Sequence, residues 1–529
     1  MILEHLGFGS LKILGLALLA GLLFRGVFNK YGHGLHNIPG PWIAGFSDLW
    51  RLFLVRRRHA QEEHIALHQK YGPIVRLGPR VVSIADPDAI KTIYSPSAGW
   101  SKSQFYPVQQ ALAKGKRLET MFNTANDRYH AKLRRSVSNS YAMSTLVAFE
   151  PFVDSTSIEF LKQLKTRFVD KPGEDGICDF GAWLQFYAFD VIGELTFSKR
   201  LGFVEKGADV DNIIRDLESF LDYVSWDYAN SMNHLKVGQI PFLDNLLIKN
   251  PLKLWAAQSG LINTSAPVAQ FARKHITERQ NDESLGEEKS RRGDFLNRFK
   301  EARAKDPDFI TEQLVLALTV ANMFAGSDTT GITMRAVFYF LLKNPSTMNS
   351  LLAEISEKSK AGGFSREDGL PQWEEVRDMP YLGAVINESL RCHPAVGLTL
   401  ERMVPANGVK LAGYFLPGGT IAGCSAWVLH QSTDVYGKDA ADFRPERWLE
   451  ATTEQRRKMN NTLFSFGAGA RTCIGKNISL LELYKLVPAI LRRFELELAH
   501  PEASWKTHNA WFVRQREFYV RLKERKQIL

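Results

Sequence analysis

The stretch FGAGARTCIG, residues 466–475, decides how the rest of this chain is interpreted. It places Cys473 among three nearby glycines, with Arg471 two residues before it and Phe466 seven residues before it. Glycine lets backbone approach another group closely and adopt turn angles that are closed to other residues. Backbone N–H groups and an arginine near the sulfur would stabilise a thiolate. Cys473 could therefore be a metal ligand, a nucleophile or a packed core residue.

The residues that follow, ISLLELYKLVPAILRRF, have a helical pattern, so the sulfur should lie near a helix N-terminus. That position lowers a thiol pKa, and we expect a lowered pKa for Cys473. A nucleophilic cysteine needs a base, and the local stretch holds no histidine, although one could come from elsewhere in the fold. The other cysteines are Cys178, Cys392 and Cys424, and no two of the four form a CxxC pair, which disfavours a structural zinc site.

Length and composition are those of a large globular protein. The 529 residues can bury a large core, and 45% hydrophobic with 23% charged residues is ordinary. The net charge of +10 could suit nucleic acid, a membrane surface or an acidic partner protein. No run of basic residues resembles a nucleic-acid-binding arm, so we predict no nucleic-acid partner.

The N-terminus contains the apolar run LGFGSLKILGLALLAGLLF, residues 6–24, with Lys12 as its only charge. A helix of this length spans the hydrocarbon core of a bilayer. A cleaved signal peptide would begin with positive charge, whereas here the basic residues follow the run. We therefore predict a retained, single membrane anchor over residues 1–28, rather than a signal peptide or a buried helix. The catalytic domain, residues 29–529, should lie on the cytosolic side.

The body of the chain has mainly helical patterns. Residues 310–344 are apolar nearly all round, which is typical of a helix in the centre of a large protein. Short β-branched runs at 73–84 predict a hairpin, and weaker strand signals lie at 409–420 and 518–522. The sequence predicts a mainly α fold with a small β part, in one large domain plus the N-terminal transmembrane helix.

Four motifs together carry a resemblance to a known family. FGAGARTCIG resembles the haem-binding loop FxxGxRxCxG of the cytochrome P450 superfamily. AGSDTT at 325–330, ESLR at 388–391 and FRPERW at 443–448 agree with further P450 motifs in order and spacing. The resemblance covers essentially the whole chain. The details look most like filamentous-fungal microsomal P450s, such as those similar to pisatin demethylase, and imply the P450 fold.

The resemblance implies haem b, with Cys473 as the axial thiolate ligand of the iron. It gives AGSDTT the oxygen-activation role: Thr329 would hydrogen-bond iron-bound dioxygen or its water, and Asp328 would relay protons. Both side chains are costly to bury in an apolar helix without a purpose. The alternative, structural interpretation is a threonine hydroxyl bonded to its own helix and an aspartate paired nearby.

The remaining site residues are also implied by the resemblance. Glu388, Arg391 and Arg447 would form a buried structural triad behind the haem, whose disruption should be costly. The haem propionates need cations, and the candidates are Arg402, Arg471 and the pair His130 and Arg134, where the family commonly has tryptophan and arginine. The haem loop itself contributes the matching positions Phe466, Gly469, Arg471, Cys473 and Gly475.

The implied function is a haem-thiolate monooxygenase. It would insert one oxygen atom into an apolar small molecule, by hydroxylation or oxidative demethylation, in fungal secondary-metabolite biosynthesis or detoxification. It would lie in the endoplasmic reticulum membrane and take electrons from NADPH-cytochrome P450 reductase, with cytochrome b5 as a second candidate donor. The alternatives are a haem-thiolate isomerase or dehydratase without a reductase, a haem-binding sensor and a thiol hydrolase without haem.

Two surfaces follow from the same resemblance. Substrate contacts should come from residues 100–123, 215–245, 320–325, 396–400 and 509–513, which are rich in apolar and aromatic residues. A basic patch could steer reductase docking, although an ordinary charged surface is the alternative. Its candidate members are Lys132, Arg135, Arg456, Arg457, Lys458 and Lys476.

Overall fold

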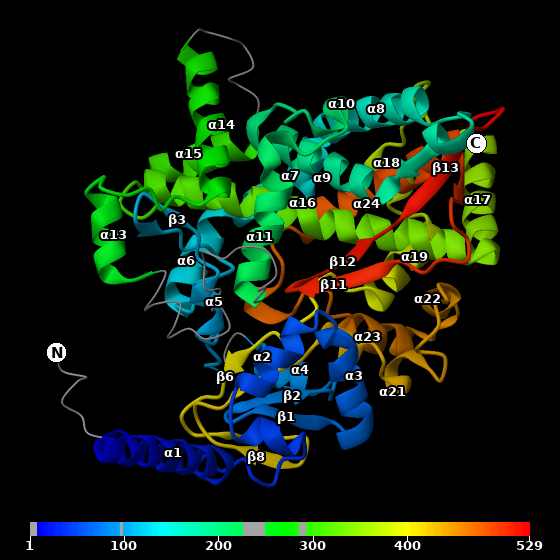
Figure 1. Ribbon diagram of the computed structural model, residues 1–529. Coiled ribbons are helices and arrows are strands. Elements are labelled where there is room, and N and C mark those ends of the chain that lie inside the picture. Colours follow the sequence, from blue (N-terminus) through cyan, green and yellow to red (C-terminus); the bar gives the residue numbers. More distant parts are fainter. Residues whose placement is uncertain (1–7, 96–98, 226–248, 285–292) are drawn as a thin grey trace.

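Helix α16 (Glu312–Lys343) runs through the middle of the protein, and most of the other helices surround it (Figure 1). The computed structural model describes residues 8–95, 99–225, 249–284 and 293–529. In the view of Figure 1 the first strands of the chain, drawn in blue, lie below this helical body, and the C-terminal strands, drawn in red, run beside the central helix. The mainly α fold with a small β part is therefore confirmed.

The elements have the following bounds. The first helices are α1 Phe8–Tyr31, α2 Leu49–Arg56, α3 Ala60–Tyr71, α4 Ala89–Ile93, α5 Phe105–Val108, α6 Asp127–Val137, α7 Met143–Val147, α8 Glu150–Arg167, α9 Phe180–Phe197, α10 Phe203–Lys206, α11 Ile213–Ser225, α13 Pro251–Gln258, α14 Pro267–Ser284 and α15 Phe295–Lys305. After α16 come α17 Pro345–Lys360, α18 Trp373–Val376, α19 Pro380–Cys392, α20 Ala426–Leu429, α21 Thr433–Tyr436, α22 Glu446–Glu450, α23 Thr453–Thr462 and α24 Lys476–Arg493. The strands are β1 Ile74–Gly78, β2 Val81–Ile84, β3 Leu112–Ala113, β4 Lys116–Arg117, β5 Ile177–Asp179, β6 Arg402–Met403, β7 Val409–Leu411, β8 Tyr414–Leu416, β9 Ile421–Gly423, β10 Phe494–Leu498, β11 Lys506–Ala510, β12 Phe512–Arg516 and β13 Tyr519–Glu524.

The long central helix forms as its sequence predicts. Thr311 caps it, accepting a hydrogen bond from the Leu314 N–H at 3.2 Å. Asn344 ends it just before Pro345. Gly326 does not interrupt α16, which is continuous there. A Cβ at Gly326 would meet Ile192 of α9, so this glycine allows the two helices to pack closely.

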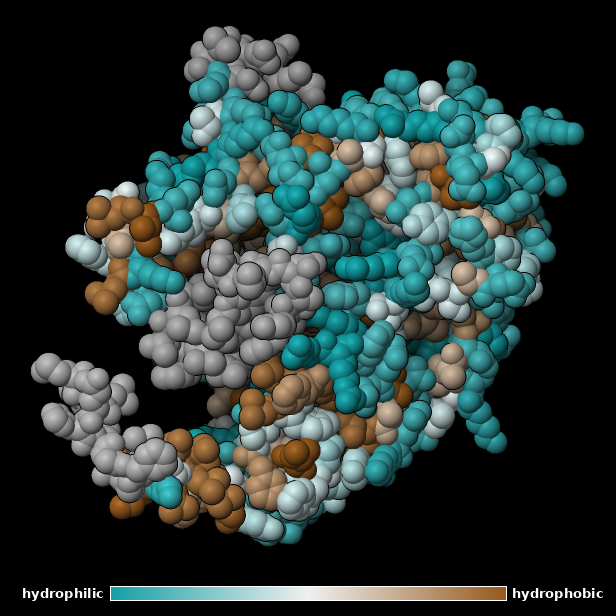
Figure 2. Space-filling model, viewed as in Figure 1, coloured by the Kyte–Doolittle hydropathy of each residue, from teal (hydrophilic) through white to brown (hydrophobic). Residues whose placement is uncertain are grey.

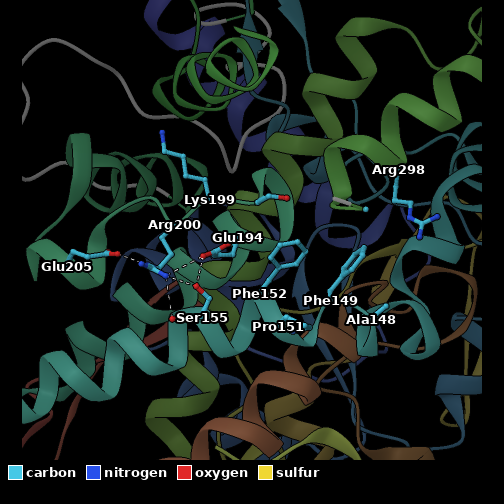
Figure 3. Close-up of a pocket in the computed structure, with 12 residues that line it drawn as sticks. Ala148, Phe149, Pro151, Phe152, Ser155, Glu194, Lys199, Arg200, Glu205 and Arg298 are labelled. Carbon is cyan, nitrogen blue, oxygen red and sulfur yellow. Dashed lines mark hydrogen bonds and ion pairs between the residues drawn. The ribbon is translucent and has the colours of Figure 1, made fainter. Parts of the chain in front are cut away.

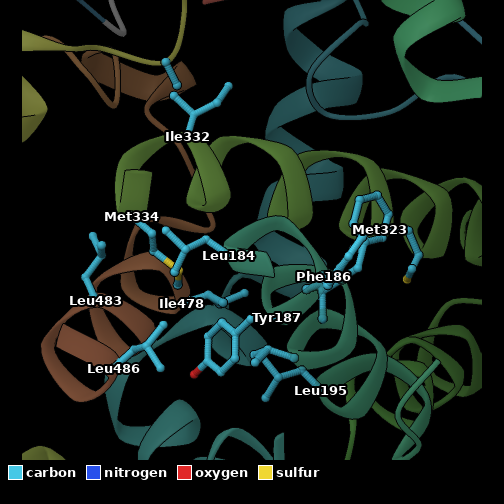
Figure 4. Packing of buried hydrophobic residues seen from close by; sticks show 14 of the residues in the cluster. Leu184, Phe186, Tyr187, Leu195, Met323, Ile332, Met334, Ile478, Leu483 and Leu486 are labelled. Carbon is cyan, nitrogen blue, oxygen red and sulfur yellow. The ribbon is translucent and has the colours of Figure 1, made fainter. Parts of the chain in front are cut away.

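The core forms where α9, α16 and α24 meet (Figure 4). Leu184 from α9, Met334 from α16 and Leu486 from α24 point toward one another there, all fully buried. Burying such side chains stabilises the fold by about 1.5–3 kcal/mol each. The core therefore fixes α24, whose N-terminus carries the Cys473 loop, against the central helix.

The β part contains the predicted hairpin. Strands β1 and β2 pair antiparallel, with Ile74 opposite Ile84, and the sheet continues in the order β1-β2-β9-β6. A second sheet has the order β10-β13-β5, and β11 and β12 form a separate C-terminal hairpin. The first sheet thus joins residues near the N-terminus to β6 and β9, which come from the region just after α19.

Among the described residues, one helix is long and apolar enough to cross a membrane. It is the part of α1 from Lys12 to Tyr31, and none of its most apolar window is buried against the protein. In Figure 1, α1 projects away from the body of the molecule. This placement fits the predicted membrane anchor.

Candidate active site

The Cys473 loop is a tight structure between α23 and α24. The Cys473 N–H donates to the Phe466 carbonyl oxygen at 2.9 Å, which closes the loop. Gly469 has φ +67°, and a Cβ there would collide with the carbonyl oxygen of Tyr94, so only glycine fits. Cys473 is exposed, whereas Cys178 and Cys424 are buried. The loop therefore presents its sulfur rather than packing it away.

The thiol pKa differs from the sequence expectation. Although Cys473 has exposed surface, the protein atoms that surround its other sides desolvate the thiol and raise its pKa above the usual value. The N–H groups of Gly475 and Lys476 and the charge of Arg134 only partly oppose this. The expected lowered pKa is wrong, because desolvation outweighs the helix N-terminus. Arg471, which we expected to assist the sulfur, points elsewhere and pairs with Asp127 at 2.6 Å. A bound metal ion would deprotonate the thiol outright.

The predicted propionate-binding cations come together around one buried imidazole. His130 is buried, and its pKa is lowered to about 3 by burial and by the charges of Arg471, Lys102, Arg134 and Arg402, in that order. Taken with the protein alone, His130 is therefore a neutral hydrogen-bonding group, not the cation that we predicted. The other predicted cations, Arg134, Arg402 and Arg471, carry guanidinium groups, which are not deprotonated in proteins.

Lys102 belongs to the same cluster and was missed in the sequence, where it lay in a segment assigned to substrate contacts. It is buried, its ammonium donates to the Phe122 carbonyl oxygen, and it lies over the Tyr106 ring at 4.1 Å. Burial and the charges of Arg402 and Arg471 lower its pKa well below the usual value. In the described part of the chain, Lys102 has no carboxylate within ion-pair distance. Of the four cations in this cluster, Lys102, Arg134, Arg402 and Arg471, Arg471 alone forms an ion pair among the described residues, with Asp127.

The central helix places Thr329 and Asp328 differently. Thr329 is partly exposed, one turn from the exposed Ala325, on a helix whose other faces are mostly buried. Its hydroxyl donates to the Ala325 carbonyl oxygen at 2.7 Å, so only its oxygen lone pairs are left for another group. This bond to its own helix is the contact that the structural interpretation of Thr329 predicts.

Asp328 is fully buried and paired. Arg514 of β12 donates from Nε to both of its carboxylate oxygens at 3.0 Å, and Gln185 of α9 donates to Oδ1 at 3.1 Å. Arg514 also contacts Glu218 of α11 at 2.9 Å, and the Glu218 side chain is 37% exposed. The carboxylate is thus connected through one arginine to a group at the surface. Nothing in the sequence motifs indicated Arg514.

Glu388, Arg391 and Arg447 lie in contact, as predicted. Glu388 Oε1 is 2.7 Å from Arg391 Nη2 and 2.9 Å from Arg447 Nε, and all three side chains are buried. Trp448 donates to Glu388 Oε2 at 2.9 Å. Burial alone would raise the pKa of Glu388, but the hydrogen bond and charge of Arg391 and the charge of Arg447 outweigh it, so the pKa is lowered.

A histidine that the sequence did not single out connects this triad to the cysteine loop. His430 Nδ1 lies 2.8 Å from the Arg391 carbonyl oxygen, and its Nε2 accepts the Phe464 N–H at 2.8 Å. Burial lowers the pKa of His430 to about 3, which leaves the ring neutral, as the accepting nitrogen requires. Ser465 adds a second connection, donating to the Leu390 carbonyl oxygen at 2.6 Å.

Several segments predicted to contact substrate lie side by side. Phe105 and Phe122, from segment 100–123, pack against Trp511 of segment 509–513 with ring centroids 5.4 and 5.9 Å apart. Val396 forms an isolated bridge with Phe512, and Phe220 packs edge-on against Phe324 of segment 320–325. Most of segment 215–245 lies outside the described residues.

A surface pocket of about 740 Å³ is separate from these groups (Figure 3). Its residues come mainly from α8, the end of α9 and the following loop. Ser155, Glu194 and Glu205 converge on Arg200, which donates to Ser155 Oγ at 2.6 Å and to Glu205 Oε1 at 2.5 Å. It includes none of the predicted site residues.

The comparisons with known proteins agree with this geometry. The family model described as cytochrome P450 matches residues 39–520. The chain belongs to the cytochrome P450 family. It is 43% identical over 467 residues to a cytochrome P450 monooxygenase of Aspergillus terreus, covering 87% of this chain and 90% of that protein. It is 39% identical over 491 residues to the cytochrome P450 monooxygenase cicH of Emericella nidulans, covering 93% and 94%. The protein is a haem-thiolate monooxygenase, and the finer likeness to pisatin demethylase stays a prediction.

Members of this P450 family use haem iron held by a cysteine thiolate, and the residues present fit that group. Cys473 supplies the exposed sulfur in a loop that its glycine closes. The cations of this cluster are Lys102, Arg134, Arg402 and Arg471. They outnumber the carboxylates that pair with them, and the two propionates of haem would add negative charge.

Proposed function

We propose that this P450 inserts one oxygen atom from O2 into an apolar small molecule, and that Cys473 would supply the thiolate that holds the iron of haem b. The observation that carries the proposal is that the same structure has an exposed Cys473 and a buried cluster of cations with few carboxylates. When bound, a thiolate-ligated haem supplies the oxygen-activating chemistry, because the thiolate pushes electron density toward O–O cleavage.

The cation cluster has a binding role in this proposal. Arg402, Arg471, Arg134 and Lys102 hold the two propionates, and neutral His130 donates a hydrogen bond. Arg134 also donates to the Thr472 carbonyl oxygen at 2.8 Å, so one residue joins the propionate cluster to the ligand loop. Glu388, Arg391 and Arg447 act at a distance, through His430 and Ser465, by holding that loop.

Asp328 and Thr329 are the proposed proton-handling pair. The Thr329 hydroxyl donates its hydrogen bond to the Ala325 carbonyl oxygen, so its own oxygen is left to accept a hydrogen bond. It can therefore orient a water beside the helix. Arg514 stays protonated and cannot pass a proton on, so Asp328 would exchange protons with solvent by releasing its contact with Arg514, which also contacts the partly exposed Glu218. A positioned carboxylate of this kind contributes about 10²–10⁴-fold to a rate.

The substrate class follows from the side chains that gather near these groups. Phe105, Phe122, Trp511 and Phe512 are aromatic, and Val396 is aliphatic. Ligand sites lined in this way favour apolar molecules and fix them with few polar contacts. Hydroxylation and oxidative demethylation are the reactions proposed for such a substrate, in secondary-metabolite biosynthesis or detoxification. The fungal origin of the similar monooxygenases supports this setting.

The location and redox partner complete the proposal. Residues 1–28 anchor the protein in the endoplasmic reticulum membrane, and residues 29–529 form the cytosolic catalytic domain. The exposed α1 supports a single span. NADPH-cytochrome P450 reductase supplies electrons, with cytochrome b5 as a second candidate. Exposed Lys132 and Arg135 lie on α6, which Arg134 attaches to the Cys473 loop, so they flank the sulfur side.

The spectrum of the reduced, CO-bound protein tests the proposal. We expect a strongly red-shifted Soret band that is lost in Cys473→Ala and retained in the matched control Cys178→Ala, whose thiol is buried in β5. A wild-type protein without haem would overturn the proposal. Substrate turnover that needs no O2 and no NADPH would instead indicate an isomerase or dehydratase, and a haem protein that never consumes NADPH with reductase would indicate a sensor.

A further inference from the structure

Arg76 of β1 makes a contact that the monooxygenase chemistry does not use. Its side chain is buried, and its guanidinium has five N–H groups, all of which donate to backbone carbonyl oxygens. Nε donates to Gly78 at 3.1 Å and Nη2 to Pro79 at 2.7 Å, both in its own hairpin. The other three bonds leave the hairpin. Among the described residues, Arg76 forms no ion pair.

The three remaining bonds reach the membrane helix and the linker behind it. Nη2 donates to the Asn29 carbonyl oxygen at 2.8 Å, and Nη1 donates to those of Lys30 at 2.9 Å and Leu35 at 3.2 Å. Asn29 and Lys30 lie in the last turn of α1, where carbonyl groups have no partner within the helix. A cation at that end also interacts favourably with the helix dipole. Arg76 therefore caps the anchor helix from within the first sheet of the catalytic domain.

Other bonds attach the same turn of α1 to the domain. The Asn29 side chain donates to the Phe46 carbonyl oxygen at 2.8 Å, and Lys30 reaches the Trp42 carbonyl oxygen at 3.4 Å. The Arg76 N–H donates to Pro39 at 2.8 Å, so the stiff linker after α1 is attached to β1 as well. A helix held at its end by this many bonds has a fixed direction relative to the sheet, unlike a helix on a loose tether.

Apolar side chains surround this joint. In the short helix η1 (Trp42–Gly45), Trp42 is 71% exposed and Ile43 is 57% exposed, and Leu49 and Phe53 of the adjacent α2 are also exposed. Figure 2 shows hydrophobic surface over α1 and, close by, over the region of α2. We call Trp42, Ile43, Leu49 and Phe53 the root surface. It continues the exposed apolar surface of α1, and tryptophan is enriched at membrane interfaces.

We propose that Arg76 holds α1 in a fixed orientation to the first sheet and to the root surface, which faces the lipid bilayer, so that the anchor and the catalytic domain move as one body. This inference rests on the proposed membrane anchor. The bilayer is the partner because the surface is continuous with the helix that would span it. Lysine cannot replace Arg76, since an ammonium has three N–H groups and no planar fork.

The test uses the full haem-loaded chain in phosphatidylcholine vesicles. Nitroxide labels at Leu23→Cys in α1 and Lys91→Cys on α4 report the distance between these two sites by pulsed electron spin resonance. The protein without these two substitutions, treated with the same label, gives the background from the native cysteines. We expect a narrow distance distribution, and a broad one in Arg76→Lys. The control Arg80→Lys, an exposed arginine in the same hairpin, should stay narrow. A bimane at Ile43→Cys should be quenched by brominated phosphatidylcholine, and less so in Arg76→Lys.

The outcomes separate this inference from the proposed function. A broad distribution in the wild type overturns it without any variant, and so does an Arg76→Lys protein that stays narrow and equally quenched. If Arg76→Lys does not fold, shown by loss of the CO-bound spectrum, the wild-type distribution and quenching decide alone. Protein that alkaline carbonate washes off the vesicles would refute the anchor itself, while a protein that stays bound with a broad distribution refutes only the fixed joint.

Discussion

Arg514 of β12 contacts both carboxylate oxygens of Asp328 on α16, with Nε 3.0 Å from each and Nη2 2.9 Å from Oδ2. The two residues lie 186 positions apart and both are buried. A buried ion pair adds little net stability, but the loss of one partner leaves an uncompensated charge. The pair therefore ties the C-terminal hairpin to the central helix and at the same time gives the proposed proton carrier a countercharge.

A double-mutant cycle should show this dependence. We expect Arg514→Gln to lower the free energy of unfolding by about 3–5 kcal/mol, because Gln185 would be the remaining partner of Asp328 among the described residues. In the double variant with Asp328→Asn the loss should be clearly smaller than the sum of the two single losses. Denaturant unfolding measures all four proteins. Additive losses would mean that the two groups do not interact in solution.

Thr329 has a matched control in the same helix. Ser327 donates to the Met323 carbonyl oxygen at 2.7 Å, as Thr329 does to Ala325, but Ser327 is buried and Thr329 is partly exposed. If Thr329 orients a water for catalysis, Thr329→Ala should lower product formed per NADPH by about 10-fold or more. Ser327→Ala should change it little. Equal, small effects on NADPH coupling would favour the purely structural interpretation of both hydroxyls.

Lys102 should contribute to cofactor retention. A hydrogen bond to a charged group is worth about 1.5–3 kcal/mol, so Lys102→Gln should weaken haem binding about 10–100-fold. The apoprotein should not lose stability to the same extent, because the variant removes repulsion from Arg402 and Arg471. Haem transfer to an excess of apomyoglobin measures the loss rate. An unchanged rate in Lys102→Gln would place Lys102 outside the propionate site.

The buried triad should matter far more to stability than a surface ion pair of similar length. Glu388→Gln should lower the free energy of unfolding by about 3–5 kcal/mol, because Arg391 would remain buried without its carboxylate and Arg447 would keep Asp439 but lose Glu388. Glu524→Gln removes the exposed pair with Lys165 and should cost at most about 1 kcal/mol. The lowered pKa of Glu388 also predicts that its contribution is present above the unfolded-state pKa and is lost as the pH falls through the folded-state value. Chemical denaturation at several pH values checks both statements.

The basic patch predicts a salt-dependent encounter with the reductase. The double variant Arg135→Glu and Lys476→Glu should slow electron transfer from NADPH-cytochrome P450 reductase by about 10-fold at low ionic strength, and much less at high salt. The double variant Lys91→Glu and Lys410→Glu, at exposed positions on α4 and β7, makes the same change of net charge at a different place and is the control. Equal effects of both charge reversals would mean that the surface acts through net charge alone.

The sequence predicted those features that depend on local spacing. The helix around AGSDTT, the closed loop before Cys473 and the contact of Glu388 with Arg391 follow from residues within a few turns of each other. Lys102, His430 and Arg514 were not predictable in this way, because their partners come from segments that only the tertiary fold brings together. The predicted direction of the pKa shift of Cys473 was wrong for a related reason. Helix position can be inferred from a pattern, but the extent of burial that opposes it cannot.

Glu482 of α24 provides a test of how burial alone changes the pKa of a carboxyl group. Its side chain is fully buried, neither carboxylate oxygen has a hydrogen-bond partner among the described residues, and burial raises its pKa well above the usual 4.5. The folded protein therefore keeps this proton to a higher pH than the unfolded chain does. Stability from this group is present below pH 4.5 and falls by about 1.4 kcal/mol per pH unit above it, until the folded-state pKa is reached.

Glu482→Gln removes this titration while keeping the shape of the side chain. We expect the variant to be more stable than the wild type at about pH 8, and the difference to disappear toward about pH 4, because there both proteins carry a neutral group at this position. The exposed Glu502→Gln is the matched control and should show no such trend. Unfolding curves in urea across this pH range give the comparison. A difference that does not change with pH would mean that Glu482 is charged in the folded protein and has found a partner, so that burial alone does not set its state.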